Sequence, residues 1–425
     1  MNEIINFSVE ELITKISNSQ ITSVEICKAY IERIDKFEKE INAWAFFDKE
    51  LLLEKAKESD DYKKSGKPIG PLHGIPVAVK DIVGTLDMPT ECGTPIRKGK
   101  SYSQNAEIID LLHASGAIVM GKTVTTELAF LNPAKTKNPH DYTRTPGGSS
   151  SGSAAVIAAK MAPLSIGTQT GGSVIRPASF CGVVGYKPSY GLISTNGILK
   201  TSYHLDQVGV FGNSVEDVKI LSEILFSKDK LTKKKHYSKK PRFVFFKTDR
   251  WRNVDKLSRL SFENFIKKNK KIIKVIKAPN YFEKIINFHT IIYETELAEN
   301  FYHLYISSKS KLSKEIKSAI SNGLKHAAKD YAIALNYLRT VEKNFDKIFS
   351  DFDGILTPSS CGVANKGFKT TGSPEFNKIW TFAHMPCISL PILHGEKNLP
   401  LGLQLICKKK DDIKLLELSN TLNKM

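Results

Sequence analysis

The sequence predicts an α/β fold in which strands and helices alternate and pack in layers. Short apolar runs of strand length alternate along the chain with longer stretches of helical periodicity. Hydrophobic residues make up 41% and charged residues 25% of the 425 residues, which is ordinary for a globular protein and excludes a chain that is disordered throughout. No apolar run approaches the roughly 20 residues that a membrane-spanning helix needs. We therefore expect a folded protein with no membrane segment.

The first fifty residues are predicted to form two helices. Ser8 and Thr22 each lie three residues before a glutamate, Glu11 and Glu25, and this is the spacing of a capping box at a helix N-terminus. The N-terminal segment is acidic and amphipathic, so it does not resemble a signal or transit peptide. We expect a cytoplasmic protein.

The next elements are predicted from local apolar patterns. Residues 75–79 (IPVAV) form a short strand that ends at Lys80, residues 105–114 form a helix, and residues 117–120 (AIVM) form a buried strand. Residues 140–202 are rich in Gly, Ser, Thr and Pro but keep apolar segments. This composition is typical of catalytic loops that a rigid scaffold supports.

The second half of the chain is predicted to contain more helix. Residues 228–240 are expected to form an exposed loop, and Phe243–Phe246 a strand. A largely helical region follows to about residue 350. Short strands, loops and a final helix complete the chain.

A net charge of +18 suggests a nucleic-acid partner, but the distribution of the charge argues against one. Of the 62 basic residues 53 are Lys, whereas bidentate phosphate and base contacts favour Arg. Residues 228–277 alone hold 19 Lys and Arg against 4 Asp and Glu, a net of +15. We interpret this segment as a solvated Lys-rich surface and expect no nucleic-acid partner. A patch that binds an acidic partner is the alternative.

The cysteines and histidines predict neither a metal nor a cofactor site. The six cysteines include no CxxC pair, which excludes a zinc site of that type and a disulfide framework and fits a reducing compartment. The ten histidines show no HExxH or other paired spacing. We expect no metal and no cofactor.

Two short motifs match known sites only formally. Residues Gly116–Thr123 fit the phosphate-binding pattern GxxxxGK[ST], but the residues between the glycines are an apolar run that we predict to be a strand. Residues 148–152 fit GxSxG with Ser150 as nucleophile, but turn-forming residues precede them instead of the required strand. We expect a Gly/Ser loop there, followed by a helix that starts near Ala154.

A longer pattern is far more specific. It consists of PLHGIPVAVKD (71–81), TPGGSSSGSAA (145–155) and IGTQTGGSVIRPASFCGVVGYKPSYG (166–191). The last two segments resemble the signature of the amidase signature family of serine hydrolases. The resemblance extends over most of the chain, with further matching segments in the same order: LDQVGVF (205–211), SVEDVKIL (214–221), DGILTPSS (353–360), TGSPEFNKIWTFAHMPCISLP (371–391) and LPLGLQLI (399–406).

The resemblance implies a catalytic triad. The family's lysine corresponds to Lys80, its bridging serine, which follows a cis peptide bond, to Ser149, and its nucleophile to Ser173. A serine hydroxyl is a weak nucleophile and needs an adjacent base. A lysine with the usual pKa of about 10.4 cannot be that base at neutral pH, but burial would lower the pKa of Lys80. Asp81 would oppose this, yet consecutive strand residues point in opposite directions, so we expect it to face elsewhere.

The remaining site residues follow from the same chemistry. A hydroxyl both donates and accepts, so Ser149 can relay a proton between Ser173 and the lysine. The loop Thr170-Gly171-Gly172-Ser173 can direct successive backbone N–H groups to one point, and we expect it to form the oxyanion hole.

Residues around Ser173 separate two classes within the family. The A subunit of the tRNA-dependent amidotransferase typically reads DTGGSIRQPA, whereas this chain has Gln169 and Arg176 in the segment QTGGSVIRPA. We therefore expect a hydrolase that converts a small carboxamide or ureide-type amide to a carboxylate and ammonia through an acyl-Ser173 intermediate. The A subunit of the amidotransferase, which is a glutaminase that passes ammonia to a partner, is the alternative. A catalytically silent basic protein that binds an acidic partner is a third class, and intact Lys80, Ser149 and Ser173 argue against it.

Arg176 and the partners remain open at this level. Arg176 would bind a substrate carboxylate if the enzyme resembles a malonamidase, or would bond loop carbonyls in a structural role. The partner we expect is the small amide substrate, with no membrane. A homodimer is left open.

The resemblance also implies the layout of the chain. We expect one amidase domain over residues 1–425, with a large mixed central sheet flanked by helices on both faces. Its parts are N-terminal helices (8–65), a catalytic core (about 70–225), a helical region that covers the substrate (about 255–350) and C-terminal strands with a helix (about 351–425).

Overall fold

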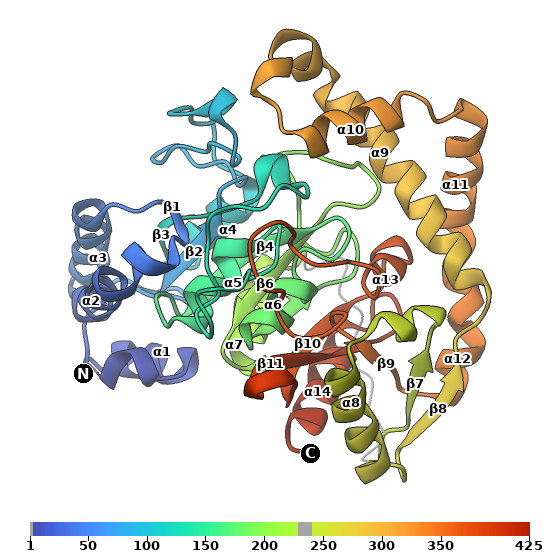
Figure 1. Ribbon diagram of the computed structural model, residues 1–425. Coiled ribbons are helices and arrows are strands. Elements are labelled where there is room, and N and C mark those ends of the chain that lie inside the picture. The colour runs from blue at the N-terminus through green and yellow to red at the C-terminus, as the bar shows by residue number, and fades with distance from the viewer. Residues whose placement is uncertain (1–2, 228–239) are drawn as a thin grey trace.

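A mixed sheet of 11 strands runs through the computed structural model, which describes residues 3–227 and 240–425 (Figure 1). The strand order is β1-β3-β2-β4-β6-β5-β10-β11-β9-β7-β8. Pairs β2–β3, β2–β4, β7–β9 and β7–β8 are parallel, and the pairs between β4 and β9 across the middle of the sheet are antiparallel. The strands are β1 (Trp44–Phe46), β2 (Pro76–Lys80), β3 (Ile118–Thr123), β4 (Leu164–Gln169), β5 (Val184–Lys187), β6 (Gln207–Gly212), β7 (Phe243–Lys247), β8 (Ile273–Lys277), β9 (Gly354–Pro358), β10 (Cys387–His394) and β11 (Pro400–Ile406).

Helices cover both faces of this sheet, as expected. In β5, a Cβ atom added to Gly185 would lie 2.5 Å from the Cβ of Ala178 in α6. The next residue, Tyr186, donates from its hydroxyl to Asp412 in α14 at 2.6 Å. Because neighbouring strand residues point to opposite faces, α6 and α14 lie on opposite sides of the sheet. The helices are α1 (Val9–Ser17), α2 (Ser23–Ile41), α3 (Lys49–Lys64), α4 (Glu107–Ala114), α5 (Ser151–Ala158), α6 (Ile175–Cys181), α7 (Val215–Leu225), α8 (Lys256–Lys268), α9 (Tyr281–Ser307), α10 (Lys314–Gly323), α11 (Ala328–Thr340), α12 (Asp346–Asp351), α13 (Lys378–Phe382) and α14 (Asp412–Asn423).

The N-terminal helices begin where the capping boxes predict. The side chains of Ser8 and Thr22 accept hydrogen bonds from the backbone of Glu11 and Glu25, and each glutamate bonds back to the cap residue. These reciprocal bonds satisfy N–H groups that the first helical turn would otherwise leave unpaired.

The phosphate-binding motif is a strand, as predicted, although the strand is longer. It starts at Ile118 and continues through Gly121 to Thr123. Lys122 is buried and donates to the carbonyl of Val83 and, at 2.7 Å, to the hydroxyl of Thr90. The motif therefore forms part of the sheet and not an open phosphate cradle.

The region after residue 255 is less helical than predicted. Residues 273–277 (IKVIK) form β8, an edge strand parallel to β7, between helices α8 and α9. Most of its residues are exposed or half-buried. Lysines on such a strand are typical of a sheet edge that faces solvent. The exposed loop expected over residues 228–240 lies outside the described residues except for Lys240, which is exposed.

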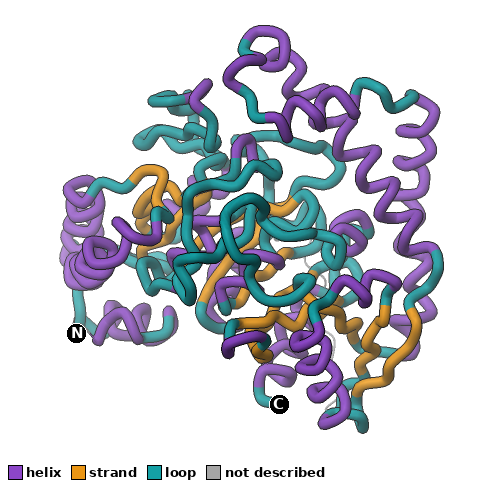
Figure 2. The backbone as a smooth tube through the Cα atoms, viewed as in Figure 1, coloured by secondary structure: helices purple, strands orange, loops and turns teal. Residues whose placement is uncertain are grey.

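The long helix α9 runs beside α10 and α11 along one side of the sheet, as Figures 1 and 2 show. Beneath these helices lies a core of large aromatic residues, among them Phe246, Phe282, Phe345 and Trp380. In the part of the chain that the structure describes, no helix combines the length and the apolar character needed to cross a membrane.

Candidate active site

Lys80 is the last residue of β2, and its side chain is fully buried. Its ammonium nitrogen Nζ lies 2.7 Å from the hydroxyl of Ser149 and 2.9 Å from that of Thr168. Burial lowers the pKa of Lys80 to about 7, although the negative charge of Asp206 opposes the shift. A substantial fraction of Lys80 is therefore neutral near pH 7 and able to accept a proton.

Asp81 faces away from this amine, as expected from strand geometry. Its carboxylate accepts from the backbone N–H of Glu91 at 2.9 Å. Burial raises the pKa of Asp81 to about 6, and the nearby charge that counteracts burial is that of Lys122. Asp81 therefore does not form an ion pair that would hold Lys80 protonated.

Ser149 follows a cis peptide bond between Gly148 and Ser149, as the family resemblance implies. The next residue, Ser150, cannot serve as the nucleophile of a GxSxG elbow. Its hydroxyl is buried and bonds the backbone of Thr168, and it precedes α5, which begins at Ser151 and not near Ala154. A loop, and not a strand, leads into this turn.

Ser173 lies in the loop between β4 and α6 and lines a pocket of about 160 Å³. Gly171 and Gly172 line the same pocket. Among the described residues, the backbone N–H groups of Gly171, Gly172 and Ser173 find no acceptor. The loop therefore offers free donors next to the serine hydroxyl, which is what an oxyanion hole requires.

Gly172 is required by close packing. A Cβ atom at this position would lie 2.4 Å from Oδ1 of Asn377 and 3.0 Å from Nη1 of Arg176. Any other residue would push these two side chains away from the loop.

Gln169 holds the loop between β4 and α6, which contains Ser173, against the start of α6. Its Oε1 accepts from the backbone N–H groups of Val174 and Ile175 at 2.9 and 3.1 Å, and its Nε2 donates to the hydroxyl of Thr381 at 3.0 Å. An amide can accept and donate at once. The residue that distinguishes this chain from the typical amidotransferase signature is thus a structural link.

Asp206 is a site residue that the sequence reasoning missed. Its carboxylate accepts from the hydroxyls of Thr170 (2.6 Å) and Thr201 (2.7 Å) and from the backbone N–H groups of Thr201 (2.8 Å) and Ser202 (3.0 Å). It lies within LDQVGVF, which was recognised as a segment, but nothing in the sequence places it beside Thr170. Asp206 therefore fixes Thr170, the first residue of the loop that contains Ser173.

Arg176 makes structural contacts and also lines the pocket. Its Nε donates to the carbonyl of Thr371 at 2.7 Å, and its Nη2 donates to the carbonyl of Gly148 at 2.6 Å. The second bond ties the loop of Ser149 to the helix that follows Ser173. Among the described residues, Nη1 has no hydrogen-bond partner. Burial lowers the pKa of Arg176 to about 10, so the guanidinium stays charged at neutral pH.

Further lining of the pocket comes from α9, which lies within the helical region expected to cover the substrate, and from α13, whose place beside the pocket the sequence did not predict. His289 in α9 donates from Nε2 to the carbonyl of Thr170 at 2.8 Å, since a carbonyl can only accept. Burial lowers the pKa of His289 to about 3, so the ring is neutral and its Nδ1, which has no partner in the described part of the chain, is an acceptor. Lys378, the first residue of α13, also lines the pocket.

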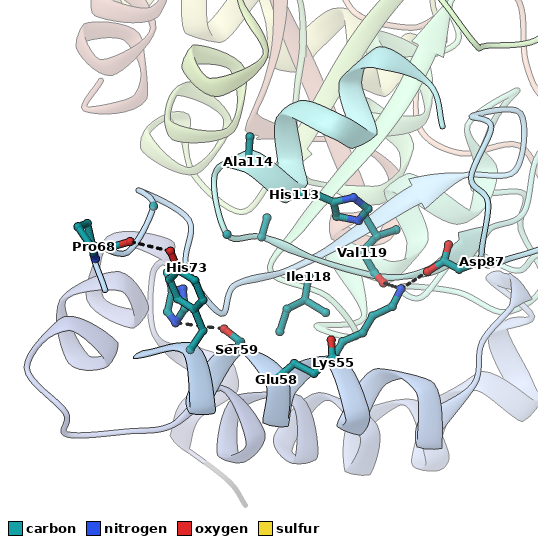
Figure 3. A pocket seen from close by; sticks show the side chains of 14 residues that line it. Lys55, Glu58, Ser59, Pro68, His73, Asp87, His113, Ala114, Ile118 and Val119 are labelled. Carbon is teal, nitrogen blue, oxygen red and sulfur yellow. Dashed lines mark hydrogen bonds and ion pairs between the residues drawn. The ribbon is translucent and has the colours of Figure 1, made fainter. Parts of the chain in front are cut away.

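A larger cavity of about 550 Å³ lies away from this chemistry, between α3 and the beginning of β3 (Figure 3). Its walls include a hydrogen bond between Ser59 and His73 and an ion pair between Lys55 and Asp87. Ile118, at the start of β3, lines this cavity. Lys80 pairs with Thr123 at the other end of β3, about 16 Å along the strand from Ile118. Cavity size alone would therefore point to a place away from Lys80.

The chain resembles characterised proteins over nearly its full length. The family model described as Amidase matches residues 25–416. A glutamyl-tRNA(Gln) amidotransferase A subunit from Clostridium acetobutylicum is 32% identical over 99% of both chains. A crystal structure of an amidase superposes with a TM-score of 0.89 at 26% identity, covering 98% of this chain and 99% of that one. The structure of the glutamyl-tRNA(Gln) amidotransferase A subunit from Thermotoga maritima gives a TM-score of 0.80 at 25% identity, covering 99% and 95%. The chain therefore belongs to the amidase family.

Proposed function

We propose that the protein hydrolyses a small carboxamide, or a ureide-type amide, to a carboxylate and ammonia through an acyl-Ser173 intermediate. Membership of the amidase family supports the broader statement that it acts on carbon–nitrogen bonds. The observation that carries the proposal is the buried contact of 2.7 Å between Lys80 and Ser149. It provides a base of lowered pKa at the end of a hydroxyl relay.

In the first half of the reaction, Ser173 Oγ attacks the carbonyl carbon of the amide. Its proton passes to Ser149, whose own proton passes to the neutral amine of Lys80. The negative charge on the substrate oxygen is stabilised by the N–H groups of the Thr170–Ser173 loop. Lys80 then returns the proton through Ser149 to the leaving nitrogen, the carbon–nitrogen bond breaks and ammonia departs.

In the second half, a water molecule attacks the acyl-Ser173 ester. Ser149 and Lys80 accept one of its two protons, and this proton returns to Ser173 as the acid leaves. The acid then loses its remaining proton to solvent and becomes the carboxylate. Every proton transfer at the reacting carbon uses groups of this chain. The proposal therefore requires no metal and no cofactor.

The proposal is tested by measuring ammonia release from the purified chain, without added protein, metal or nucleotide, against small carboxamides, ureides and glutamine. Turnover of at least one carboxamide or ureide is expected. Absence of turnover across the panel, with no labelling of Ser173 by a serine-directed phosphonate, would contradict the proposal.

The second candidate is the A subunit of a tRNA-dependent amidotransferase, and the curated relatives favour it. Several of them carry that name at 30 to 32% identity over most of both chains. Gln169 in place of the acid favours the hydrolase instead. Purification from the native source distinguishes the two. Stoichiometric recovery with two further subunits, together with tRNA-stimulated glutaminase activity, would establish the amidotransferase and leave the catalytic residues unchanged.

A further inference from the structure

Two cationic side chains line the pocket beside Ser173 and lack carboxylate partners. The unpartnered Nη1 of Arg176 is one of them. The other is Lys378, whose amine makes a single hydrogen bond, of 3.2 Å, to the hydroxyl of Thr290. An ammonium group has three donors, so two of those on Lys378 are unused. Within residues 3–227 and 240–425, neither cation lies within ion-pair distance of a carboxylate.

The two carboxylates that attract Lys378 electrostatically, those of Glu294 and Glu375, have other partners. Glu294, which also lines the pocket, pairs with His326 at 2.9 Å. Glu375 lies 3.7 Å from Nη1 of Arg250 and accepts from Asn253 at 2.8 Å. Burial lowers the pKa of Lys378 despite the attraction of Glu294 and Glu375. Two partly desolvated cations therefore lack a complementary anion.

The size of the pocket limits what could supply that anion. Its volume of about 160 Å³ is below the roughly 300 to 1,000 Å³ of sites for drug-sized ligands. A cation that is removed from water is stabilised by a partner that forms charge-assisted hydrogen bonds with it. A carboxylate on a short chain fits both conditions.

We infer that the pocket selects amides whose short acyl chain ends in a carboxylate, with Lys378 as a specificity-determining residue beside Arg176. This inference rests on the proposed hydrolysis at Ser173. The substrate class is the monoamide of a small dicarboxylic acid. An amino-acid amide such as glutamine fits less well because its ammonium group would need Glu294, which is already paired with His326.

The test compares succinamate with its neutral diamide, succinamide. For the native enzyme we expect kcat/KM to be at least about tenfold higher for succinamate, because only this substrate brings a negative charge to the two cations. Lys378→Met should remove about tenfold of that preference, mainly by raising the KM for succinamate. Lys378→Arg, which keeps the charge, should retain most of the preference. Lys329→Met, which removes an exposed lysine on α11, is the matched control.

A binding measurement separates failure of this inference from failure of the proposed function. Succinate should bind the native protein more tightly than succinamide by calorimetry, and Lys378→Met should weaken succinate binding about tenfold. Succinate binding that depends on Lys378 without turnover of any amide would contradict the hydrolase and support the subsite. Equal use of succinamate and succinamide with no effect of Lys378→Met would overturn the subsite while the hydrolase stands. A preference for glutamine over succinamate would also overturn it.

Discussion

Lys80 shows how burial lowers the pKa of an ordinary lysine enough for the base role that we propose. On a surface its amine would be protonated at neutral pH, but inside the protein it is held against Ser149 and Thr168 with a pKa of about 7. The neighbouring Asp81 could have cancelled the effect, and strand geometry keeps it turned away. Because consecutive side chains point in opposite directions, Lys80 and Asp81 do not form an ion pair, although they are neighbours in the sequence.

The pKa of Lys80 predicts the pH dependence of the reaction. Only the neutral amine accepts a proton, and the neutral form predominates above the folded pKa of about 7. We therefore expect kcat/KM to increase through this pH and to level off above it. Lys80→Ala should lose several orders of magnitude, and Lys80→Arg should not restore activity because a guanidinium stays protonated. Near-normal turnover by the arginine variant would show that the residue acts only through its positive charge.

The hydroxyls of Ser150 and Ser173 have different roles in our proposal, so alanine variants of the two serines should differ in activity. Ser173→Ala should abolish amide hydrolysis because the attacking oxygen is lost. Ser150→Ala removes only hydrogen bonds to the backbone of Thr168 and should remain active. Ammonia release from both variants checks this. Substantial activity of the Ser173→Ala protein would be incompatible with the proposed nucleophile.

At the level of elements, the proposed catalytic residues come from three separate segments of the chain. β2 supplies Lys80, the turn before α5 supplies Ser149, and the loop between β4 and α6 supplies Ser173. Arg176 joins two of these loops by donating to the carbonyl of Gly148. Asp206 holds the nucleophile loop from its other end, through Thr170.

The contact between Asp206 and Thr170 predicts a positioning effect with its own signature. Asp206→Asn keeps the shape but removes the negative charge that raises the pKa of Lys80. We expect kcat to fall by about tenfold, since a hydrogen bond to a charged group contributes about 1.5 to 3 kcal/mol. We also expect the rising limb of the pH profile to move to lower pH. A purely structural role would lower kcat and leave that limb in place.

The elements also show where sequence reasoning stops. The capping boxes and apolar runs located α1, α2, β2 and β3 because these signals are local. β8 was missed because a short edge strand lies between two helices and buries few side chains. Lys80, Ser149 and Ser173 could be assigned only through the family motif. His289 belongs to no motif and Lys378 lies in the matching segment 371–391, but only the packing of α9 and α13 brings the two residues to the pocket.

At the scale of the whole molecule, the positive charge is concentrated away from the catalytic residues in the sequence. The segment 228–277 includes exposed lysines at the end of α8 and on β8, namely Lys267, Lys268, Lys270, Lys271 and Lys274. Charges in solvent are screened beyond about 8 to 10 Å at physiological salt. The charge pattern therefore gives no information on the catalytic chemistry.

Neutralising these lysines tests that separation. Replacing all five with glutamine should leave kcat/KM for a neutral amide within about threefold of the native value, because screened charges act weakly on an uncharged substrate. An anionic substrate could respond more through steering, and that response should disappear at high salt. A large loss with the neutral amide would link the basic segment to catalysis.

The assignment of nucleophile and base is best checked by mapping a covalent adduct with mass spectrometry after treatment with a serine-directed phosphonate at several pH values. We predict one adduct, on Ser173, whose rate of formation increases with pH through about 7, as the pKa of Lys80 requires. The adduct should form far more slowly in the Lys80→Ala protein. Labelling of Ser150 in place of Ser173, or labelling of Ser173 at a rate independent of Lys80, would contradict the assignment.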